Sequence, residues 1–279
     1  MMKRNFQQVD VFTVKPYMGN PVAVVFDAAE LSTEQMARFA NWTNLSETTF
    51  ICPPTDPSAD YLLRIFTPSQ ELPFAGHPTL GSCHAWLRSG GKPKSPSVVQ
   101  QCAAGLIEIR SEGDILSFAA PKRQRSGPLG EASLKQIIAG LNISPEDIIA
   151  HEWCDNGPPW QTVLLRSDEL VLNANPNPQI IKDIGFLGLV GPSHNSPFSF
   201  EIRAFFPSSS GLSEDPVTGS LNAAIAQWLI GHGLAPKSYM ARQGTALGRC
   251  GIIHLNMDEQ GQVWVGGQSV SCVSGTVDL

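Results

Sequence analysis

Two segments of the chain are apolar around nearly the whole circumference of a helix, and short strand-like runs follow each of them. The segments are residues 78–88 and 216–230, and each begins at a proline, a residue favoured at the first helical position. A helix that is apolar on all sides is buried. The runs that follow, 106–110 and 115–119 in one case and 252–256 and 263–265 in the other, have the length and composition of strands. The pattern predicts two α/β (α+β) halves, each a mostly antiparallel sheet around a central helix.

Further elements precede each of these helices. The runs 8–14 and 22–26, joined through Tyr17-Met-Gly-Asn-Pro21, predict a first hairpin. A helix is expected at 32–41, where Ser32 can cap the N-terminus, and its counterpart in the second half is expected at 133–141. The alternation of Asn and Pro predicts an irregular loop at 173–178, and the run Ser208-Ser-Ser210 predicts a turn.

The chain also repeats itself once. Arg64-Ile-Phe-Thr-Pro-Ser69 returns as Arg203-Ala-Phe-Phe-Pro-Ser208, and Pro78-Thr-Leu-Gly-Ser82 returns as Pro216-Val-Thr-Gly-Ser220. Aligned on the two prolines, His77 and Asp215 are equivalent. The repeat predicts two domains, 1–125 and 126–279, connected by a linker within 122–131, and leaves open whether the last strand returns to the first half.

Composition narrows the classes of protein to which the chain can belong. Its 279 residues carry 19 basic and 25 acidic side chains, a net charge of −6, and the basic residues are scattered, so nucleic acid is not an expected partner. The polar N-terminus predicts a cytoplasmic protein, and no stretch reaches the roughly 18 apolar residues of a membrane span. Six widely spaced cysteines without a C-x-x-C pair predict reduced, mostly buried thiols and no metal site.

The starts of the two apolar helices are candidate anion sites. The unpaired N–H groups of a first helical turn carry partial positive charge, and the glycine–serine pairs Gly81-Ser82 and Gly219-Ser220 would let an anion approach the backbone closely. The alternative is that Asp215 only caps its helix. Glu47, in Asn44-Leu-Ser-Glu-Thr-Thr-Phe-Ile51, would by itself be taken as an exposed loop glutamate. Dinucleotide, P-loop, serine-hydrolase and H-E-x-x-H motifs are not found in the sequence.

Four segments in order resemble the phenazine-biosynthesis (PhzF-like) isomerase family. They are Gly19-Asn-Pro21, Asn44-Leu-Ser-Glu-Thr-Thr-Phe50, Glu71-Leu-Pro-Phe-Ala-Gly-His-Pro-Thr79 and Glu214-Asp-Pro-Val-Thr-Gly-Ser220, and the match runs over essentially the whole chain. The resemblance implies a diaminopimelate-epimerase-like fold of two pseudo-symmetric domains with the active site between them, no cofactor, and often a homodimer.

The resemblance also implies roles for individual residues. Glu47 matches the glutamate that moves a proton between ring carbons of dihydro-hydroxyanthranilate, and six matching positions surround the substrate: Ser46, Gly76, His77, Asp215, Gly219 and Ser220. The related epimerases use two cysteines at the helix starts. Since His77 and Asp215 stand there instead, two-thiol racemisation is disfavoured, and Cys83 is expected to be a core residue.

The sequence therefore predicts a cofactor-independent isomerase that shifts a carbon-bound proton on a small cyclic or amino carboxylic acid, with Glu47 as acid and base. Two alternatives remain. The helix starts could bind a metabolite carboxylate without chemistry, or the protein could be a thiol-free amino-acid epimerase in which His77 or Asp215 is the second base. The sequence does not identify the substrate or the pathway.

Overall fold

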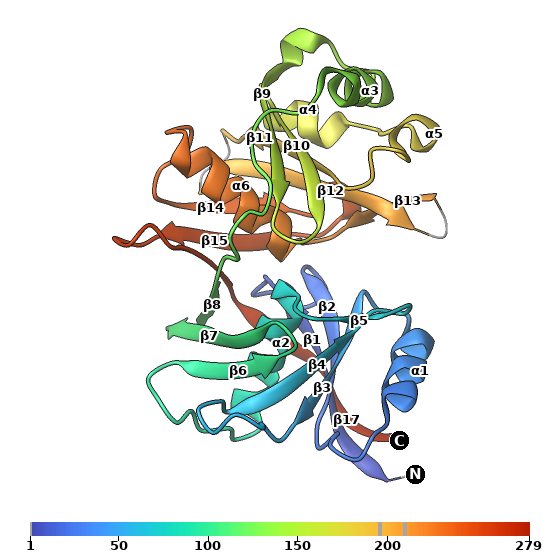
Figure 1. The fold of residues 1–279 in the computed structure, drawn as a ribbon, viewed down its shortest axis with the longest axis vertical. Helices are drawn as coiled ribbons and strands as arrows, with labels where there is room; N and C mark the ends of the chain where they lie inside the picture. The colour runs from blue at the N-terminus through green and yellow to red at the C-terminus, as the bar shows by residue number, and fades with distance from the viewer. Residues whose placement is uncertain (1, 195–196, 209–210) are drawn as a thin grey trace. The chain divides into compact units, whose positions relative to one another are not determined.

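A computed structural model describes residues 2–194, 197–208 and 211–279, and the chain forms two compact units (Figure 1). The first comprises residues up to 119 together with 266–279, and the second comprises residues 120–265. The division thus falls at 119/120, whereas the sequence suggested 125/126. Arg123 forms an ion pair with Glu152 at 2.9 Å, and Arg125 lies over the ring of Trp153, so the expected linker packs against the second unit.

The first unit is a sheet in which neighbours along the chain mostly pair. Antiparallel pairs join β1 to β2, β3 to β4, β4 to β5, β6 to β7 and β7 to β8, whereas β2–β3 and β4–β6 are parallel. The last strand, β17 (Ser269–Asp278), pairs with β1 and thus lies in the first unit. The other elements are β1 (Lys3–Val11), β2 (Asn20–Val25), α1 (Thr33–Thr43), β3 (Glu47–Cys52), β4 (Tyr61–Phe66), β5 (Glu71–Leu72), α2 (Gly76–Arg88), β6 (Val98–Cys102), β7 (Gly105–Glu112) and β8 (Ile115–Ala119).

The second unit repeats this topology. Strands β9–β10, β11–β12, β12–β13 and β14–β15 are antiparallel, whereas β10–β11 and β12–β14 are parallel, the same pattern as in β1 to β7. This match confirms the internal repeat. The elements are α3 (Glu131–Leu141), β9 (Ile148–Asp155), β10 (Pro159–Leu165), α4 (Asp168–Asn173), α5 (Pro178–Ile181), β11 (Leu187–Pro192), β12 (Phe200–Ser208), β13 (Gly211–Asp215), α6 (Gly219–Gly231), β14 (Ser238–Gln243), β15 (Gly251–Met257) and β16 (Val263–Gly267), the last of which crosses from the second unit to the first.

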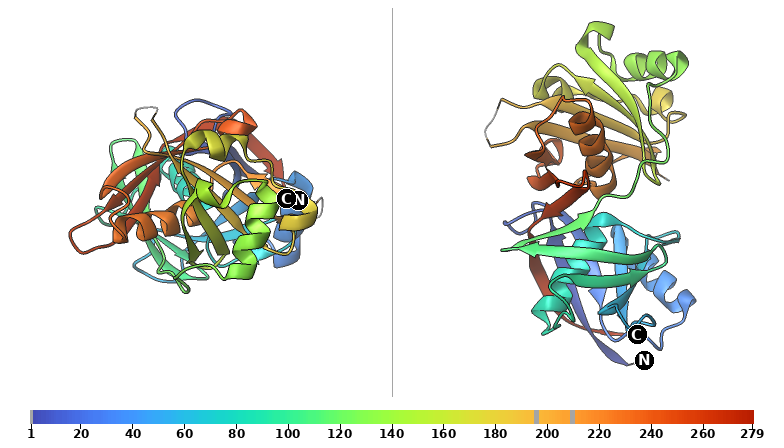
Figure 2. Two further views of the ribbon diagram at one scale, coloured as in Figure 1. Left: turned by 90° about the horizontal axis from the view of Figure 1, so that it is seen from above. Right: turned by 60° about the vertical axis from the view of Figure 1, so that its left-hand side comes forward.

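Each unit has one helix on the inner face of its sheet, as the apolar pattern predicts. In α2 the residues from Gly76 to Cys83 are all buried, and Gly81 packs directly on Val11 and Val22 of the strands. In α6, Leu221 packs on Gly188 of β11. The other helices cover the outer faces of the sheets (Figure 2). Helix α1 packs on Val25, Phe50 and Phe66. Helices α3, α4 and α5 pack on strands β10 to β12, with which they form one apolar cluster.

The remaining element predictions are mostly confirmed. The first hairpin forms as β1 and β2, and Ser32 caps α1 in a capping box with Gln35. Residues 174–177 form the irregular connection between α4 and α5. The expected turn at 208–210 falls largely on positions 209 and 210, which lie outside the described residues. The helix expected at 133–141 is α3, but its equivalence with α1 is wrong, because α3 precedes β9 whereas α1 lies between β2 and β3.

The predicted alignment of the two helix starts is also wrong. Proline does not open either helix: Pro78 is the third residue of α2, and Pro216 precedes Thr218, the N-cap of α6. Glu71 lies opposite Phe66 and Glu214 lies opposite Phe205 in the same register. Extended from these strands, the repeat aligns Glu71-Leu-Pro-Phe-Ala-Gly-His77 with Glu214-Asp-Pro-Val-Thr-Gly-Ser220, so His77 is equivalent to Ser220 and Asp215 to Leu72.

Candidate active site

Glu47 is the first residue of β3, and its side chain is only 15 % exposed. Asn44 ends α1 in the left-handed conformation, a common helix terminus, and the chain then enters β3 with the exposed Ser46 just before it. In the parallel pairing of β2 and β3, Glu47 lies opposite Val22. The interpretation of Glu47 as an exposed loop residue is therefore wrong: the strand holds its carboxyl group in a largely buried place.

His77, in the first turn of α2, faces this carboxyl group. Its Nε2 atom lies 3.1 Å from Oε2 of Glu47, and its side chain is 7 % exposed. The ring also forms a hydrogen bond with the backbone of Pro21. Since proline has no N–H, the ring donates this bond to the carbonyl oxygen, and because Nε2 faces Glu47, the donor is Nδ1. The Pro21 bond thus fixes both the orientation and the tautomer of His77.

Burial keeps the His77 ring neutral. Removal from water lowers the pKa of His77 to about 3, and the bond to Pro21 opposes this shift without reversing it. A neutral ring protonated on Nδ1 has a lone pair on Nε2. When Glu47 carries a proton on Oε2, Nε2 can accept a hydrogen bond from it. The pair is therefore arranged to stabilise the acid form of Glu47.

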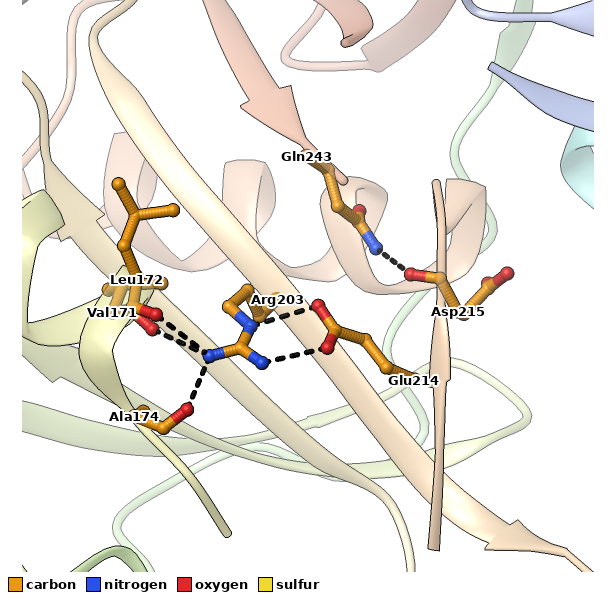
Figure 3. A network of polar contacts seen from close by, with 7 residues as sticks. All are labelled: Val171, Leu172, Ala174, Arg203, Glu214, Asp215 and Gln243. Atoms are coloured by element: carbon orange, nitrogen blue, oxygen red, sulfur yellow. Dashed lines mark hydrogen bonds and ion pairs between the residues drawn. The ribbon is translucent and has the colours of Figure 1, made fainter. Parts of the chain in front are cut away.

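Asp215 is the last residue of β13 in the second unit. Its Oδ2 atom accepts a hydrogen bond from the Thr218 hydroxyl at 2.6 Å, and its carbonyl oxygen accepts one from Gln243 at 3.0 Å (Figure 3). The alternative that Asp215 caps α6 is wrong, because the N-cap is Thr218. Gln243 also accepts hydrogen bonds from the Thr218 backbone and the Asn222 side chain, so one buried amide holds Asp215 and the first turn of α6 together.

Gly219 and Ser220 are the first two residues of α6. The Ser220 hydroxyl accepts a hydrogen bond from the indole N–H of Trp160 at 3.1 Å, and its carbonyl oxygen accepts one from the amide of Asn156 at 2.9 Å. Sequence reasoning missed both partners, because they lie about 60 residues away, at the β9–β10 hairpin. These bonds fix the orientation of the helix start and of the Ser220 side chain.

The comparison with known proteins decides the family. The model of the phenazine biosynthesis-like protein family (PhzC-PhzF) matches residues 9–275. The chain belongs to this family. A Schizosaccharomyces pombe protein named Antisense-enhancing sequence 1 is 38 % identical over 99 % of both chains. The trans-2,3-dihydro-3-hydroxyanthranilate isomerase of Pseudomonas chlororaphis is 32 % identical over 97 % of this chain and 98 % of its own.

Solved structures show the same fold. The Bacillus anthracis phenazine biosynthesis protein of the PhzF family superposes with a TM-score of 0.85 at 21 % identity, over 100 % of both chains. The predicted epimerase-like architecture of two repeated sheet-and-helix units is thereby confirmed. Because the family model matches nearly the whole chain and the relatives include named isomerases, the protein is an isomerase of the PhzF family.

An ion pair next to Asp215 is common to both repeats of this PhzF-family fold. Arg203 binds both carboxylate oxygens of Glu214, at 2.9 and 2.7 Å, and its remaining nitrogen donates to the carbonyl oxygens of Val171, Leu172 and Ala174 (Figure 3). Arg64 binds both oxygens of Glu71 in the same way, at 2.7 Å each. The matching arginines were visible in the repeat, whereas their role in fixing β5 and β13 was not predicted.

The thiol of Cys83 lacks the features of a reactive group. Cys83 is fully buried within α2, and burial raises its pKa to about 12, so it is a core residue as expected.

Across the described ranges, no three His, Cys, Asp or Glu side chains cluster as metal ligands would. Among the residues placed by the structure, no helix is both long and apolar enough to span a membrane.

A pH dependence of stability follows from the lowered pKa of His77. In the unfolded chain this histidine is protonated below a pH of about 6.5, whereas in the folded protein the buried His77 ring stays neutral to about pH 3. The contribution of His77 to folding stability is therefore complete above pH 6.5 and is lost as the pH falls. Between pH 7 and pH 5 this effect lowers the free energy of unfolding by about 2 kcal/mol. The test uses Glu47→Gln as its background, because the carboxyl group next to His77 then no longer titrates. We expect this loss of unfolding free energy in Glu47→Gln and not in the double variant Glu47→Gln/His77→Gln. Denaturant unfolding at both pH values measures the difference, and equal pH dependence in the two variants would contradict a buried neutral ring.

Proposed function

We propose that Glu47 transfers a carbon-bound proton on a small carboxylic acid, acting first as base and then as acid. The observation that supports this proposal is the 3.1 Å approach of its Oε2 atom to Nε2 of the buried, neutral His77. A general base must readily take up a proton, and a hydrogen-bond acceptor beside a largely buried carboxyl group stabilises the protonated form that proton abstraction produces.

The proposed reaction moves one proton and leaves the atoms balanced. The Glu47 carboxylate takes a proton from one carbon, and the electron pair of the broken C–H bond delocalises into the unsaturated system or the carboxyl group of the substrate. His77 then accepts a hydrogen bond from the protonated Glu47. Return of the proton to a different carbon gives the isomer and regenerates the carboxylate, so no cofactor is required by this proposal.

We further propose the remaining residues as contacts for the substrate. Gly76, with its neighbour His77, begins α2, and Gly219 and Ser220 begin α6, two helices of 13 residues whose first turns attract negative charge. The hydroxyl of Ser46 can donate a hydrogen bond to a substrate carboxylate, and the carboxylate of Asp215 can accept one from a substrate amine. A cytoplasmic location and a homodimer are likewise part of the proposal, and the homodimer rests on the family resemblance alone.

The substrate class is a small cyclic, unsaturated or amino carboxylic acid. The Pseudomonas chlororaphis relative is named for its action on trans-2,3-dihydro-3-hydroxyanthranilate, and this compound is the first to test. The purified protein would be incubated in heavy water with this compound and a panel of related acids, and mass spectrometry and NMR would follow isomer formation and deuterium at carbon. Conversion that requires the enzyme supports the proposal.

Two other outcomes would replace the proposal. Thermal stabilisation by an acid without isomer formation or exchange at carbon would indicate a metabolite-binding protein. Inversion of an α-carbon in an amino acid, without movement of a double bond, would indicate an epimerase. In that case His77→Gln and Asp215→Asn would identify the second base by loss of exchange from one of the two enantiomers.

A further inference from the structure

A buried carboxylate closes the loop between β1 and β2. Asp10, near the end of β1, is 3 % exposed, and its Oδ2 atom accepts hydrogen bonds from the backbone N–H groups of Met18 at 2.8 Å and Gly19 at 3.0 Å. Backbone N–H groups bound to a carboxylate form stronger hydrogen bonds than neutral pairs do. A single oxygen atom of Asp10 thus holds the segment that leads into β2.

This segment has little freedom to lie elsewhere. A Cβ atom on Gly19 would overlap the carbonyl group of Val11, so the loop passes directly over the end of β1 and requires glycine at this point. The next residue, Asn20, is fully buried, and Pro21 then lies opposite Asp10 in the β1–β2 register. The first residues of β2 are therefore fixed by Asp10 and by close packing.

The start of β2 in turn positions both members of the Glu47–His77 pair. The Pro21 backbone receives the hydrogen bond of the His77 ring, and Val22 lies opposite Glu47 in the β2–β3 pairing. A displacement of these two residues would change the orientation of the imidazole and the separation of its Nε2 atom from the carboxyl group. Misplacement by about 1 Å can lower a catalysed rate by about a hundredfold.

We propose that Asp10 is a positioning residue for the active site. Its carboxylate fixes the start of β2 and, through Pro21 and Val22, the tautomer of His77 and the approach of His77 to Glu47. The effect on turnover rests on the proposed function, whereas the effect on the His77 ring does not depend on any substrate.

The test compares Asp10→Ala with Asp60→Ala. Asp60 lies in the same unit, and its carboxylate also accepts two backbone hydrogen bonds, from the N–H groups of Lys94 at 2.9 Å and Val99 at 2.8 Å. Removal of the Asp60 carboxylate is therefore a matched structural change at another loop. Histidine labelled with ¹⁵N reports the tautomer of each ring, and the spectrum of His77→Gln identifies the His77 signals. We expect a ring protonated on Nδ1 in the wild type and in Asp60→Ala, and averaged tautomers in Asp10→Ala.

On any substrate that the enzyme converts, Asp10→Ala is expected to lower kcat by about 10- to 100-fold with KM changed less than about threefold. Asp60→Ala should retain the wild-type kcat. If Asp10→Ala does not fold, Asp10→Asn takes its place, because an amide oxygen accepts more weakly than a carboxylate and should give a smaller shift in the same direction.

Wild-type His77 signals in the folded Asp10 variant would overturn the proposal, and so would altered signals with an unchanged kcat. If no acid is converted, the proposed function fails while the ring measurement still decides whether Asp10 positions His77. The two failures are therefore distinguishable.

Discussion

Replacing Glu47 with glutamine is expected to lower kcat by roughly 10²- to 10⁴-fold while the protein stays folded and binds substrate. The amide has nearly the same shape as the carboxyl group but cannot accept a proton from carbon. Because the side chain is only 15 % exposed, little water is available to replace it as the base. Steady-state kinetics on a substrate from the acid panel, with thermal unfolding measured in parallel, would give both quantities.

Glu112→Gln is the control for this change. Glu112 is an exposed residue of β7 in the same unit, so the same chemical change there should leave kcat and thermal stability at their wild-type values. If Glu47→Gln kept the wild-type kcat, another residue would have to be the base. If it lost activity only because it unfolded, the thermal measurement would show it.

Removal of Glu214 is expected to destabilise the second unit by about 3–5 kcal/mol, because it leaves the buried charge of Arg203 without its carboxylate. The two side chains of this pair are only 8 % and 10 % exposed. The repeat supplies the control. Arg64 and Glu71 make the same two-bond contact at similar distances, but they are 25 % and 35 % exposed, and an exposed pair contributes about 1 kcal/mol or less.

The comparison is between Glu214→Ala and Glu71→Ala. Hydrogen exchange measured by mass spectrometry reports the opening free energy of each unit separately, which a single unfolding curve of a two-unit protein does not. We expect a large loss of protection in the second unit for Glu214→Ala and a small loss in the first unit for Glu71→Ala. Equal losses would show that burial does not determine the strength of this ion pair.

The sequence predicted the features that local patterns encode. The buried inner helices follow from residues that are apolar on all sides, and the cap of α1 follows from Ser32 before a helical run. The topological repeat was evident because the arginine-containing strands and the helices recur in the same order. Motifs carried by the resemblance then led to Glu47, which its local sequence would have placed in an exposed loop.

The alignment of the two helix starts was predicted incorrectly, and contacts between residues far apart in the chain were not predicted. Proline suggested that two helices begin at 78 and 216, yet the strands before them set the helix starts at Gly76 and Gly219, which changes the equivalent of His77 from Asp215 to Ser220. The Pro21–His77 hydrogen bond joins residues far apart in the chain, and only the three-dimensional structure reveals such contacts.

The central claim is that Glu47 moves a proton to and from carbon, and one isotope measurement tests it most directly. Wild-type protein and Glu47→Gln would each be incubated with trans-2,3-dihydro-3-hydroxyanthranilate and the acid panel in heavy water, and NMR would locate every proton or deuteron that changes carbon. The account predicts that the wild type relocates or exchanges a carbon-bound proton on at least one acid and that Glu47→Gln does not. Proton relocation at the wild-type rate in Glu47→Gln would contradict it.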